Sequence, residues 1–406
     1  MTRVAVLGAG AWGTSIASVL AARLEVTLWA RDPAQAQLIA RTRRNERYLR
    51  GIEIPAAVRI TANLADVERA DLFLAATPVA GLRELLQKIE KDPPVVWLCK
   101  GFEEGTGLLP HQIAEQTLLE QRLEAGEWVV SVELDPPKGT NMESMLRVAE
   151  RLRVSGAVHE ADINDNPMAR ARLSALMAAV AIERTVGLET IPHVTPRDAS
   201  VMGLQSQLLG AHAAGIRNVL AVTGDPPHVG DYPGSSGVYE VDAIGLTAML
   251  SHLNAGEDFS GKAIDAPTSF YVGVAVNPSA DDMTTEIERF RRKLDAGARF
   301  GMTQALFDIG YLDRMLDELG GSPIPLLVGV WPLTSAQLAF RLHNEVPGIT
   351  IPDEVQRRLA DAGADARRLG FELARELVDA ARSRAAGVYV IPPFKEPEAA
   401  LELLAT

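Results

Sequence analysis

Glu133 is the residue of this sequence that suggests chemistry most directly. It lies in VVSVELDPPKG (129–139), where three alternating apolar residues mark a short buried strand and two prolines end it. Glu133 points to the opposite face from these apolar residues, at the carboxyl end of the strand. A carboxylate in such a place is costly unless it has a function. The structural alternative is a glutamate that leaves the sheet for solvent.

Other polar side chains accumulate at the carboxyl ends of further predicted strands. Each also has a purely structural explanation: His193 can be a satisfied core imidazole, Gln304 a surface amide, and either Asp165 or Asp225 a helix cap. Independent caps have no reason to include a glutamate, a histidine and a glutamine at matching strand ends, which favours a shared pocket. The full set is Glu133, Asn164-Asp165, His193, Thr223-Gly224-Asp225, Asn277, Gln304 and Tyr389.

A long loop follows the fourth of these strands. Its sequence, GDPPHVGDYPGSSGVYEVD (224–242), is rich in Gly, Pro and Asp, which suits a shaped loop that holds a large planar ligand. Lys293, in RRKLDAGA, can supply positive charge for a phosphate, and its alternative is a solvated lysine on a helix. HxxEH, GxSxG, P-loop and paired-histidine motifs do not occur, which disfavours metal-dependent hydrolysis and serine nucleophile chemistry. We predict no metal site.

Strands and helices alternate from Trp128 onward with the spacing of βα units. Leu369, Leu373 and Leu377, for example, lie four apart on one face of a helix before the last strand. Eight such units predict a (β/α)8 barrel, which carries its active site at the carboxyl ends of its strands; an open doubly wound sheet is the alternative. The predicted strands are 129–135, 159–164, 189–195, 217–223, 269–276, 300–306, 325–331 and 387–391.

The chain opens with the pattern of a dinucleotide-binding domain. Val4 to Leu7 form the apolar run of a central parallel strand, and Gly8-x-Gly10-x-x-Gly13 leads into a helix. The glycines allow a tight turn and the close approach of a pyrophosphate, which the helix N-terminus attracts. A second strand, 26–30, ends at Arg31-Asp32, where an acidic residue would hold the ribose of NAD and an arginine the 2′-phosphate of NADP. Arg31 favours NADP slightly; the alternative is an exposed salt-bridging arginine.

Length, charge and cysteine content bound the class of protein. At 406 residues the chain suits two domains, or one barrel with an extension. The net charge of −13 argues against nucleic acid or an anionic membrane as the main partner. The single cysteine, Cys99, excludes an internal disulfide and fits a reducing cytoplasm. With neither a signal segment nor a membrane span recognisable, we expect a cytoplasmic protein and leave open whether it forms a homo-oligomer.

The first part of the chain resembles the N-terminal domain of NAD(P)-dependent glycerol-3-phosphate dehydrogenase. The matching pieces are GAGAWGTSIA, VTLWARDPAQA, RTRRNERYLRG, ADLFLAATPVAGLRELL and VVWLCKGFEEGTG. The resemblance implies that Trp12, Arg31 and the three glycines contact the cofactor, and that Lys100 contacts cofactor and substrate. It stops near Leu119, before the helical domain that carries the catalytic lysine of that family.

We therefore expect residues 1–122 to form a truncated Rossmann-like NAD(P)-binding domain that does not oxidise glycerol 3-phosphate. The charged segment 118–128 is interpreted as the end of a helix and a short linker. A barrel at 126–406 follows it.

Residues 128–406 resemble methylenetetrahydrofolate reductase. The resemblance rests on VSVELDPPKG, TIPHVTPRD, GIRNVLAVTGDPP, RRKLDAGA, MTQALFD, LHNEVPGITIP and GVYVIPPF, in this order. It is greatest to the branch in which the reductase follows a homocysteine methyltransferase domain. These motifs are far more specific than the glycine pattern at the N-terminus.

This second resemblance implies a noncovalent FAD in the barrel mouth and a ping-pong reaction. NAD(P)H would reduce the flavin and leave, and 5,10-methylenetetrahydrofolate would then receive hydride and become 5-methyltetrahydrofolate. Glu133 matches the general acid that helps protonate N10, a role open to a carboxyl group whose pKa is raised by burial. Asp225 matches the catalytic and substrate-binding aspartate near pterin and flavin, and Gln304 the glutamine that orients the pterin. The positions that match flavin contacts are Asn164, His193, Tyr239 and Lys293.

Two positions depart from the best-known bacterial reductases. In VTGD, Thr223 replaces an arginine near the flavin phosphates. In WPLTSAQ, Ala336 replaces an aromatic residue that flanks the folate. That contact is lost unless Trp331 substitutes for it. These differences bear on cofactor affinity and nucleotide choice more than on the class of reaction.

We predict an FAD-dependent methylenetetrahydrofolate reductase that uses NADH or NADPH and feeds methionine synthesis. The alternatives are a glycerol-3-phosphate dehydrogenase-like protein and a front domain that senses nucleotide and regulates the barrel. We prefer to interpret the front domain as a remnant, because a truncated sheet without its partner domain is an unsuitable regulator.

Overall fold

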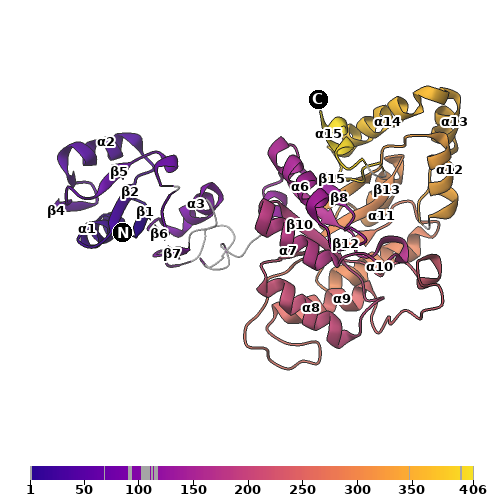
Figure 1. Ribbon diagram of the computed structural model, residues 1–406, viewed down its shortest axis with the longest axis horizontal. Helices are drawn as coiled ribbons and strands as arrows, with labels where there is room; N and C mark the ends of the chain where they lie inside the picture. The colour runs from indigo at the N-terminus through magenta and orange to yellow at the C-terminus, as the bar shows by residue number, and fades with distance from the viewer. Residues whose placement is uncertain are drawn as a thin grey trace. The chain divides into compact units, whose positions relative to one another are not determined.

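The computed structural model describes residues 2–67, 69–89, 94–101, 110, 113, 118–346, 348–393 and 396–405. The chain divides into two compact units, Met1–Gln116 and Thr117–Thr406. In Figure 1 the first unit is indigo to violet, and the second runs to yellow at the C-terminus. Three parts of the matching motifs, 102–107, Pro347 and Phe394, lie outside the described residues.

A parallel sheet of five strands, in the order β5-β2-β1-β6-β7, organises the first unit. Its central strand β1 (Arg3–Leu7) is buried from Val4 to Leu7, which confirms the predicted run. Helix α1 (Ala11–Leu20) follows the glycine-rich turn. This arrangement is that of a Rossmann-type domain, as predicted. The other elements are β2 (Glu25–Trp29), α2 (Pro33–Thr42), β3 (Arg44–Asn45), β4 (Leu49–Glu53), β5 (Arg59–Thr61), β6 (Leu72–Ala75), α3 (Leu82–Lys88) and β7 (Val95–Trp97).

The second unit contains a closed barrel of eight parallel strands, in the order β10-β11-β12-β13-β14-β15-β8-β9. All eight predicted strands are present, so the (β/α)8 prediction is confirmed and the open doubly wound sheet is wrong. The strands are β8 (Val129–Leu134), β9 (Glu160–Ile163), β10 (Glu189–Val194), β11 (Asn218–Ala221), β12 (Tyr271–Val276), β13 (Phe300–Leu306), β14 (Leu326–Val330) and β15 (Gly387–Val390).

Helices surround the barrel in the described part of the second unit, as Figure 1 shows. Several begin with a side-chain cap: Ser174, Ser200 and Asp242 each accept a hydrogen bond from a backbone N–H of the first turn. The helices are α6 (Glu143–Ser155), α7 (Ala175–Val186), α8 (Val201–Ala213), α9 (Ala243–Asn254), α10 (Met283–Asp295), α11 (Gly310–Leu319), α12 (Ala336–Glu345), α13 (Asp353–Ala362), α14 (Ala366–Ala381) and α15 (Ala399–Leu404).

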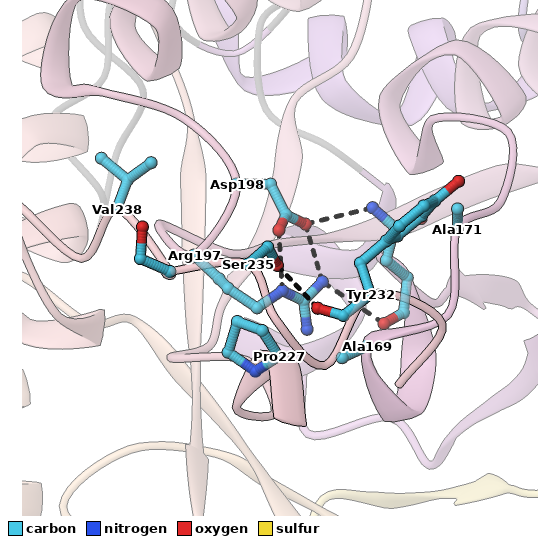
Figure 2. A pocket seen from close by; sticks show the side chains of 10 residues that line it. Ala169, Ala171, Arg197, Asp198, Pro227, Tyr232, Ser235 and Val238 are labelled. Carbon is cyan, nitrogen blue, oxygen red and sulfur yellow. Dashed lines mark hydrogen bonds and ion pairs between the residues drawn. The ribbon is translucent and has the colours of Figure 1, made fainter. Parts of the chain in front are cut away.

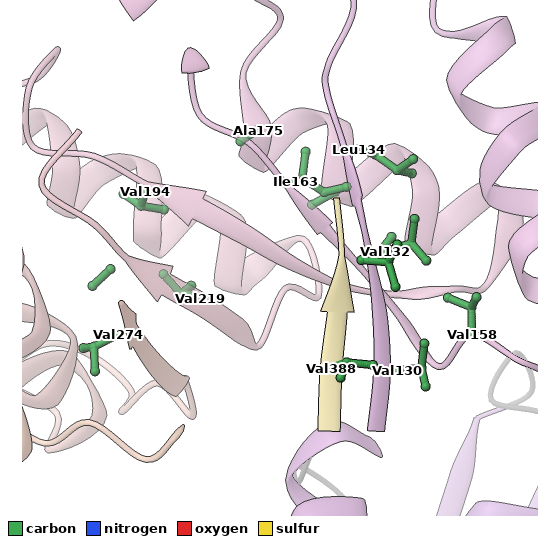
Figure 3. Packing of buried hydrophobic residues seen from close by; sticks show 14 of the residues in the cluster. Val130, Val132, Leu134, Val158, Ile163, Ala175, Val194, Val219, Val274 and Val388 are labelled. Carbon is green, nitrogen blue, oxygen red and sulfur yellow. The ribbon is translucent and has the colours of Figure 1, made fainter. Parts of the chain in front are cut away.

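Apolar side chains on the outer faces of the strands form the larger core. Val130, Val132 and Leu134 of β8 belong to one buried cluster with Val388 of β15, which pairs with β8 (Figure 3). Because successive side chains of a strand point to opposite faces, Ser131 and Glu133 point into the barrel. The predicted alternation in 129–135 therefore places Glu133 inside the ring and not in solvent.

Helix α5 (Leu118–Glu124) belongs to the second unit, and it is the helix that ends within 118–128, the segment interpreted as the end of a helix and a short linker. Leu119 and Leu123, four residues apart on one helix face, are buried and pack with Val129 and Ile191 inside the barrel. The carboxylate of Glu189, at the start of β10, accepts hydrogen bonds from the N–H groups of Leu118 and Leu119 at 3.1 and 3.2 Å. The helix thus closes the N-terminal end of the barrel.

Candidate functional site

The C-terminal ends of β8, β9 and β10 bring ionisable side chains together inside the barrel. Glu133 of β8 is the cross-strand partner of Asp162 of β9, so their side chains lie next to each other. His193 of β10 approaches Asp162, with its Nε2 atom 3.8 Å from Oδ2. Tyr389 of β15 pairs in register with Ser131, two residues before Glu133. This group of polar residues forms the floor of the barrel mouth.

Glu133 holds its proton more tightly than an ordinary glutamate. Burial is the main cause that raises its pKa well above the usual value, and the carboxyl groups of Asp162 and Asp135 raise it further. A hydrogen bond with Asn164 acts in the opposite direction. Glu133 keeps part of its surface accessible. A protonated carboxyl group that a ligand can reach is able to donate a proton at neutral pH.

Asp162 was missed in the sequence. It is fully buried, and the Ser131 hydroxyl donates to its Oδ1 at 2.5 Å. Burial raises the pKa of Asp162 to about 7. Within the described chain, neither Asp162 Oδ2 nor the facing His193 Nε2 has a hydrogen-bond partner. The signal that could have revealed Asp162 was the run Glu160, Asp162, Asn164, polar at alternate positions in a predicted buried strand.

His193 and Tyr389 complete the floor in uncharged form. Burial lowers the pKa of His193 to about 4, so its imidazole is neutral at physiological pH. The Tyr389 hydroxyl donates to Thr303 O at 2.7 Å, and burial raises its pKa well above the usual value. The interpretation of His193 as a satisfied core imidazole is wrong, because its buried Nε2 has no partner among the described residues.

Asn164 and Asp165 follow β9 and connect it to its neighbours. Asn164 donates through Nδ2 to Asp135 Oδ1 at 3.0 Å, across the ends of β8 and β9. Asp165 accepts hydrogen bonds from the N–H and hydroxyl groups of Thr195, both at 3.0 Å. Asp165 is therefore not a helix cap, and it ties the β9 loop to the end of β10.

Arg197, which the sequence analysis did not single out, holds three loops together. Its guanidinium group is buried and makes a bidentate pair with Asp198, at 2.9 and 2.7 Å. It also donates to the backbone oxygens of Asp225 and Asn166, at 3.1 and 3.3 Å. The loops after β9, β10 and β11 thus meet at one buried cation, as the dashed lines of Figure 2 show in part. A buried arginine followed by an aspartate gives no distinctive sequence signal.

Asp225 lies within this group of loops. Its Oδ2 accepts a hydrogen bond from Met168 N at 2.8 Å, and its backbone oxygen accepts one from the Tyr239 hydroxyl at 3.2 Å. Asn166, Met168 and Tyr239 all have positive φ, between 42° and 54°. Such backbone conformations are unfavourable outside glycine and persist where the surroundings enforce them. Asp225 is thus not a helix cap, and the two loops that it joins are strained.

A cleft of about 310 Å³ opens beside Arg197 and Asp198. In Figure 2 Tyr232 and Ser235 face these two residues across it, with Pro227 nearby. Its walls come from the β9 and β10 loops and from the long loop after β11, which the sequence predicted to hold a large planar ligand. A second cavity, of about 210 Å³, is lined by His193, Thr195, Asp165 and Arg172 among others.

Gln304 lies near the end of β13 and close to Asn277. A Cβ atom on Gly348 would stand 3.2 Å from Asn277 Nδ2 and 3.4 Å from Gln304 Nε2, and the φ of Gly348 is +80°. Asn277 Nδ2 donates to Gly348 O at 3.2 Å. The loop before α13 therefore approaches both amides at a point where only glycine fits.

Lys293 is buried and not a solvated helix lysine, which corrects that alternative. Its ammonium group donates to Ala275 O in β12 at 2.6 Å, and only 6% of the residue is exposed. Burial is the main cause that lowers its pKa. Ala336, one of the two positions that depart from the bacterial pattern, begins α12. Trp331, the aromatic residue named as its substitute, follows β14, and its buried indole N–H has no hydrogen-bond partner among the described residues.

The glycine-rich turn of the first unit has the geometry of a close-packed strand–helix junction. A Cβ on Gly8 would lie 2.7 Å from Ala76 O, and one on Gly13 only 1.9 Å from Gly8 O, whereas a Cβ on Gly10 would meet nothing within 4 Å. Gly8 and Gly13 are therefore needed for packing, and Gly10 leaves open space.

Gly13→Ala should lower the temperature at which the first unit unfolds. Its Cβ would push α1 away from the turn, and overpacking of this kind costs about 1–3 kcal/mol. Gly10→Ala is the matched control, because Gly10 has φ −77° and free space around it. Calorimetry of the full-length chain measures both; equal unfolding temperatures for the first unit would contradict the packing role.

The other residues predicted to contact a nucleotide lie at the surface of the first unit. Trp12 is 75% exposed, and Lys100 is exposed as well. Arg31 is exposed, and its guanidinium group lies 3.9 Å from the carboxylate of Glu84. This agrees with the alternative interpretation of Arg31 as an exposed salt-bridging arginine. Asp32 caps α2 by accepting a hydrogen bond from Ala34 N at 2.9 Å.

Neither a metal-binding cluster nor a membrane-spanning helix occurs in the described part of the chain. Groups of three or more His, Cys, Asp or Glu side chains arranged to hold a metal ion are absent from this part of the chain. Similarly, none of its helices combines the length and apolar character that crossing a membrane requires.

Two family models match the chain. Residues 118–391 match "Methylenetetrahydrofolate reductase", and residues 3–129 match "NAD-dependent glycerol-3-phosphate dehydrogenase N-terminus". The matches overlap only in the region of α5 and the start of β8. Together they correspond to the two resemblances seen in the sequence.

Curated relatives match the first unit. Glycerol-3-phosphate dehydrogenase [NAD(P)+] of Aromatoleum aromaticum is 48% identical over 120 residues, which cover 29% of this chain and 37% of that protein. The enzyme of Leptothrix cholodnii is 47% identical over 128 residues, which cover 28% and 38%. The chain thus spans well under half of the length of these relatives.

A solved structure shares the fold of the second unit. A protein of Clostridium thermocellum, described as uncharacterized and as binding two copies of 5-methyl-5,6,7,8-tetrahydrofolic acid, aligns with a TM-score of 0.51. The alignment covers 71% of this chain and 98% of that one, at 16% identity. At this identity the likeness shows the fold alone.

Proposed function

The chain belongs to the methylenetetrahydrofolate reductase family, and we propose that its barrel reduces 5,10-methylenetetrahydrofolate to 5-methyltetrahydrofolate with NAD(P)H and a noncovalent FAD. The observation that carries the proposal is Glu133, an accessible carboxyl group at the barrel mouth with a raised pKa. Opening the imidazolidine ring of this substrate needs a proton at N10, and a carboxyl group that is still protonated at neutral pH can deliver it.

The residues at the barrel mouth fit a flavin. His193 Nε2 is a buried polar atom without a partner among the described residues, and His193 lines a cavity of about 210 Å³ beside the loops after β9 and β10. A bound FAD would supply the two-electron chemistry between NAD(P)H and the folate. We assign its binding to Asn164, His193, Tyr239 and Lys293, with Lys293 acting only if its hydrogen bond to Ala275 opens.

Asp225 and Gln304 are proposed to hold the pterin. The carboxylate of Asp225 uses Oδ2 to accept from Met168, which leaves Oδ1 for a donor on the substrate. Gln304 offers an amide, which can both donate and accept, near the end of β13. The folate bound by the Clostridium thermocellum protein, which shares this fold, supports a folate ligand.

For the first unit we assign an NAD(P) site to the glycine-rich turn. Gly8 and Gly13 let α1 begin close to β1, and the open space at Gly10 admits a pyrophosphate. Trp12, Arg31 and Lys100 are exposed and available for contacts with the nucleotide.

The rate of the folate half-reaction should fall as pH rises. A general acid works only while it is protonated, and the raised pKa of Glu133 moves the loss of its proton above the ordinary carboxyl range of about 4.3. We expect a plateau that extends above the ordinary carboxyl range, followed by a decline of about tenfold per pH unit. Stopped-flow measurement of folate reduction between acid and alkaline pH checks this; a decline centred near pH 4 would exclude the assignment.

The absorption spectrum of the purified protein is the first experiment on the cofactor. We expect a flavin spectrum and oxidation of NADH or NADPH with menadione as electron acceptor. Colourless protein that FAD does not reconstitute would refute the proposed cofactor.

A further inference from the structure

Asp162 is a carboxyl group of the site that the family assignment leaves without a role. It lies beside Glu133 in the β8–β9 register, and its exposed fraction is 0%. Asp162 lies on the neighbouring strand β9 and points into the same interior as Glu133. It is the ionisable residue of β9 that is in register with Glu133. A buried carboxylate is costly, and here only one of its oxygens is hydrogen-bonded.

The neighbours of Asp162 fix its position without neutralising it. Ser131 donates to Oδ1 at 2.5 Å, which orients the carboxyl group. On the other side His193 Nε2 stands 3.8 Å from Oδ2, too far for a hydrogen bond. His193 is neutral at physiological pH because burial lowers its pKa to about 4. A stabilising cation is therefore not supplied by β8 or β10.

Among the residues that the structure describes, the groups that face the pair are acidic or neutral. Asp162 and Asp135 both favour the protonated form of Glu133, and Tyr389 of β15 faces the pair in neutral form. Two carboxyl groups this close cannot both ionise cheaply, so the site retains a proton. The groups that face Glu133 or Asp162 are Ser131, Asp135, Glu160, Asn164, His193 and Tyr389.

We infer that Asp162 is a positioning residue for the proton of Glu133. The two carboxyl groups together carry one negative charge. Asp162, which Ser131 holds in place, carries this charge, and Glu133 keeps the proton. This inference rests on the proposed role of Glu133. When Glu133 gives its proton to N10, its carboxylate becomes the second negative charge of the pair. The unfavourable pairing promotes the return of a proton from solvent, so that Glu133 is protonated again before the next turnover.

Infrared difference spectroscopy of the full-length protein tests the inference without any substrate. The C=O band of a protonated carboxyl group that disappears in Glu133→Gln reports the proton of Glu133 as pH is raised. In Asp162→Asn, which keeps an acceptor for Ser131, the midpoint of this band should move to lower pH by about one unit or more. An unchanged midpoint would overturn the inference.

Glu160→Gln is the matched control. Glu160 lies on β9 two residues before Asp162, faces the same interior and is equally buried, but its partner is Arg122 of α5 at 2.9 Å. It does not contribute to the raised pKa of Glu133. A midpoint that moves equally in both variants would indicate a general disturbance of the barrel and would also overturn the inference.

The pH profile of folate reduction separates this inference from the proposed function. If the inference is correct, the decline of the folate-reduction rate at alkaline pH moves to lower pH in Asp162→Asn. Reduction of the flavin by NAD(P)H keeps its rate. If the infrared midpoint moves but wild-type protein reduces no folate, charge sharing stands and the proposed function fails. If folate is reduced and neither midpoint nor profile moves, the function stands and Asp162 is only a structural residue.

Discussion

Glu133→Gln should lose folate reduction by about 100-fold or more, the usual contribution of a general acid, while reduction of the flavin by NAD(P)H continues. Glutamine matches the neutral form of glutamate in shape, so the floor of the barrel mouth keeps its packing. What the variant lacks is the proton for N10. Stopped-flow spectroscopy of each half-reaction, with the other substrate absent, measures the two rates separately.

Asp135→Asn is the matched control for this variant. Asp135 follows β8 by one residue, is exposed, and affects Glu133 less than burial and Asp162 do. It should change the folate rate only slightly at neutral pH. Equal loss of both half-reactions in Glu133→Gln would mean that Glu133 serves the flavin or the fold and not the proton.

Replacing both Leu119 and Leu123 by Ala should destabilise the barrel by about 4–10 kcal/mol, since a buried leucine truncated to alanine costs about 2–5 kcal/mol. Both side chains lie in the interior cluster at the N-terminal end of the barrel. Their loss also loosens α5, whose Arg122 pairs with the fully buried carboxylate of Glu160. Urea unfolding, followed by circular dichroism, measures the free energy.

The double substitution of the same leucines by methionine provides the control. Methionine keeps the volume and should cost less than about 1.5 kcal/mol per site. If the alanine variant unfolded at the same urea concentration as the wild type, α5 would not contribute to the stability of the barrel. The result also decides which residues a deletion of the first domain should remove. A deletion of residues 1–122 would take away most of α5.

The barrel could be predicted because local signals agree along its whole length. Each strand is a short apolar run with turn residues at its ends, and polar side chains recur where the runs end. For 118–128 the same signals predict only the end of a helix and a short linker. LLEQRLEAGEW has few apolar residues, and the packing role of its two buried leucines, Leu119 and Leu123, is visible only where the open end of a barrel lies beneath them.

The site was predictable only in part for a similar reason. Glu133 stands out because a proline pair follows its strand, and His193 and Gln304 stand out by residue type. Asp162 gives only the weak signal of alternating polar residues in its strand, and its place against Glu133 is seen in the folded chain. Arg197 gives no distinctive signal, and its role in joining three loops is seen only there. Lys293 shows the opposite difficulty, because its basic helix segment suggests exposure while the packing of α10 on β12 buries it.

The reoxidation of reduced flavoprotein by 5,10-methylenetetrahydrofolate tests the central claim most directly. The protein is reduced anaerobically with NAD(P)H, freed from nucleotide, and mixed with the folate while the visible flavin band is followed. We predict that the oxidised band returns and that 5-methyltetrahydrofolate forms in equal amount. A flavin that NAD(P)H reduces but the folate leaves reduced would contradict the assignment of this barrel as a methylenetetrahydrofolate reductase.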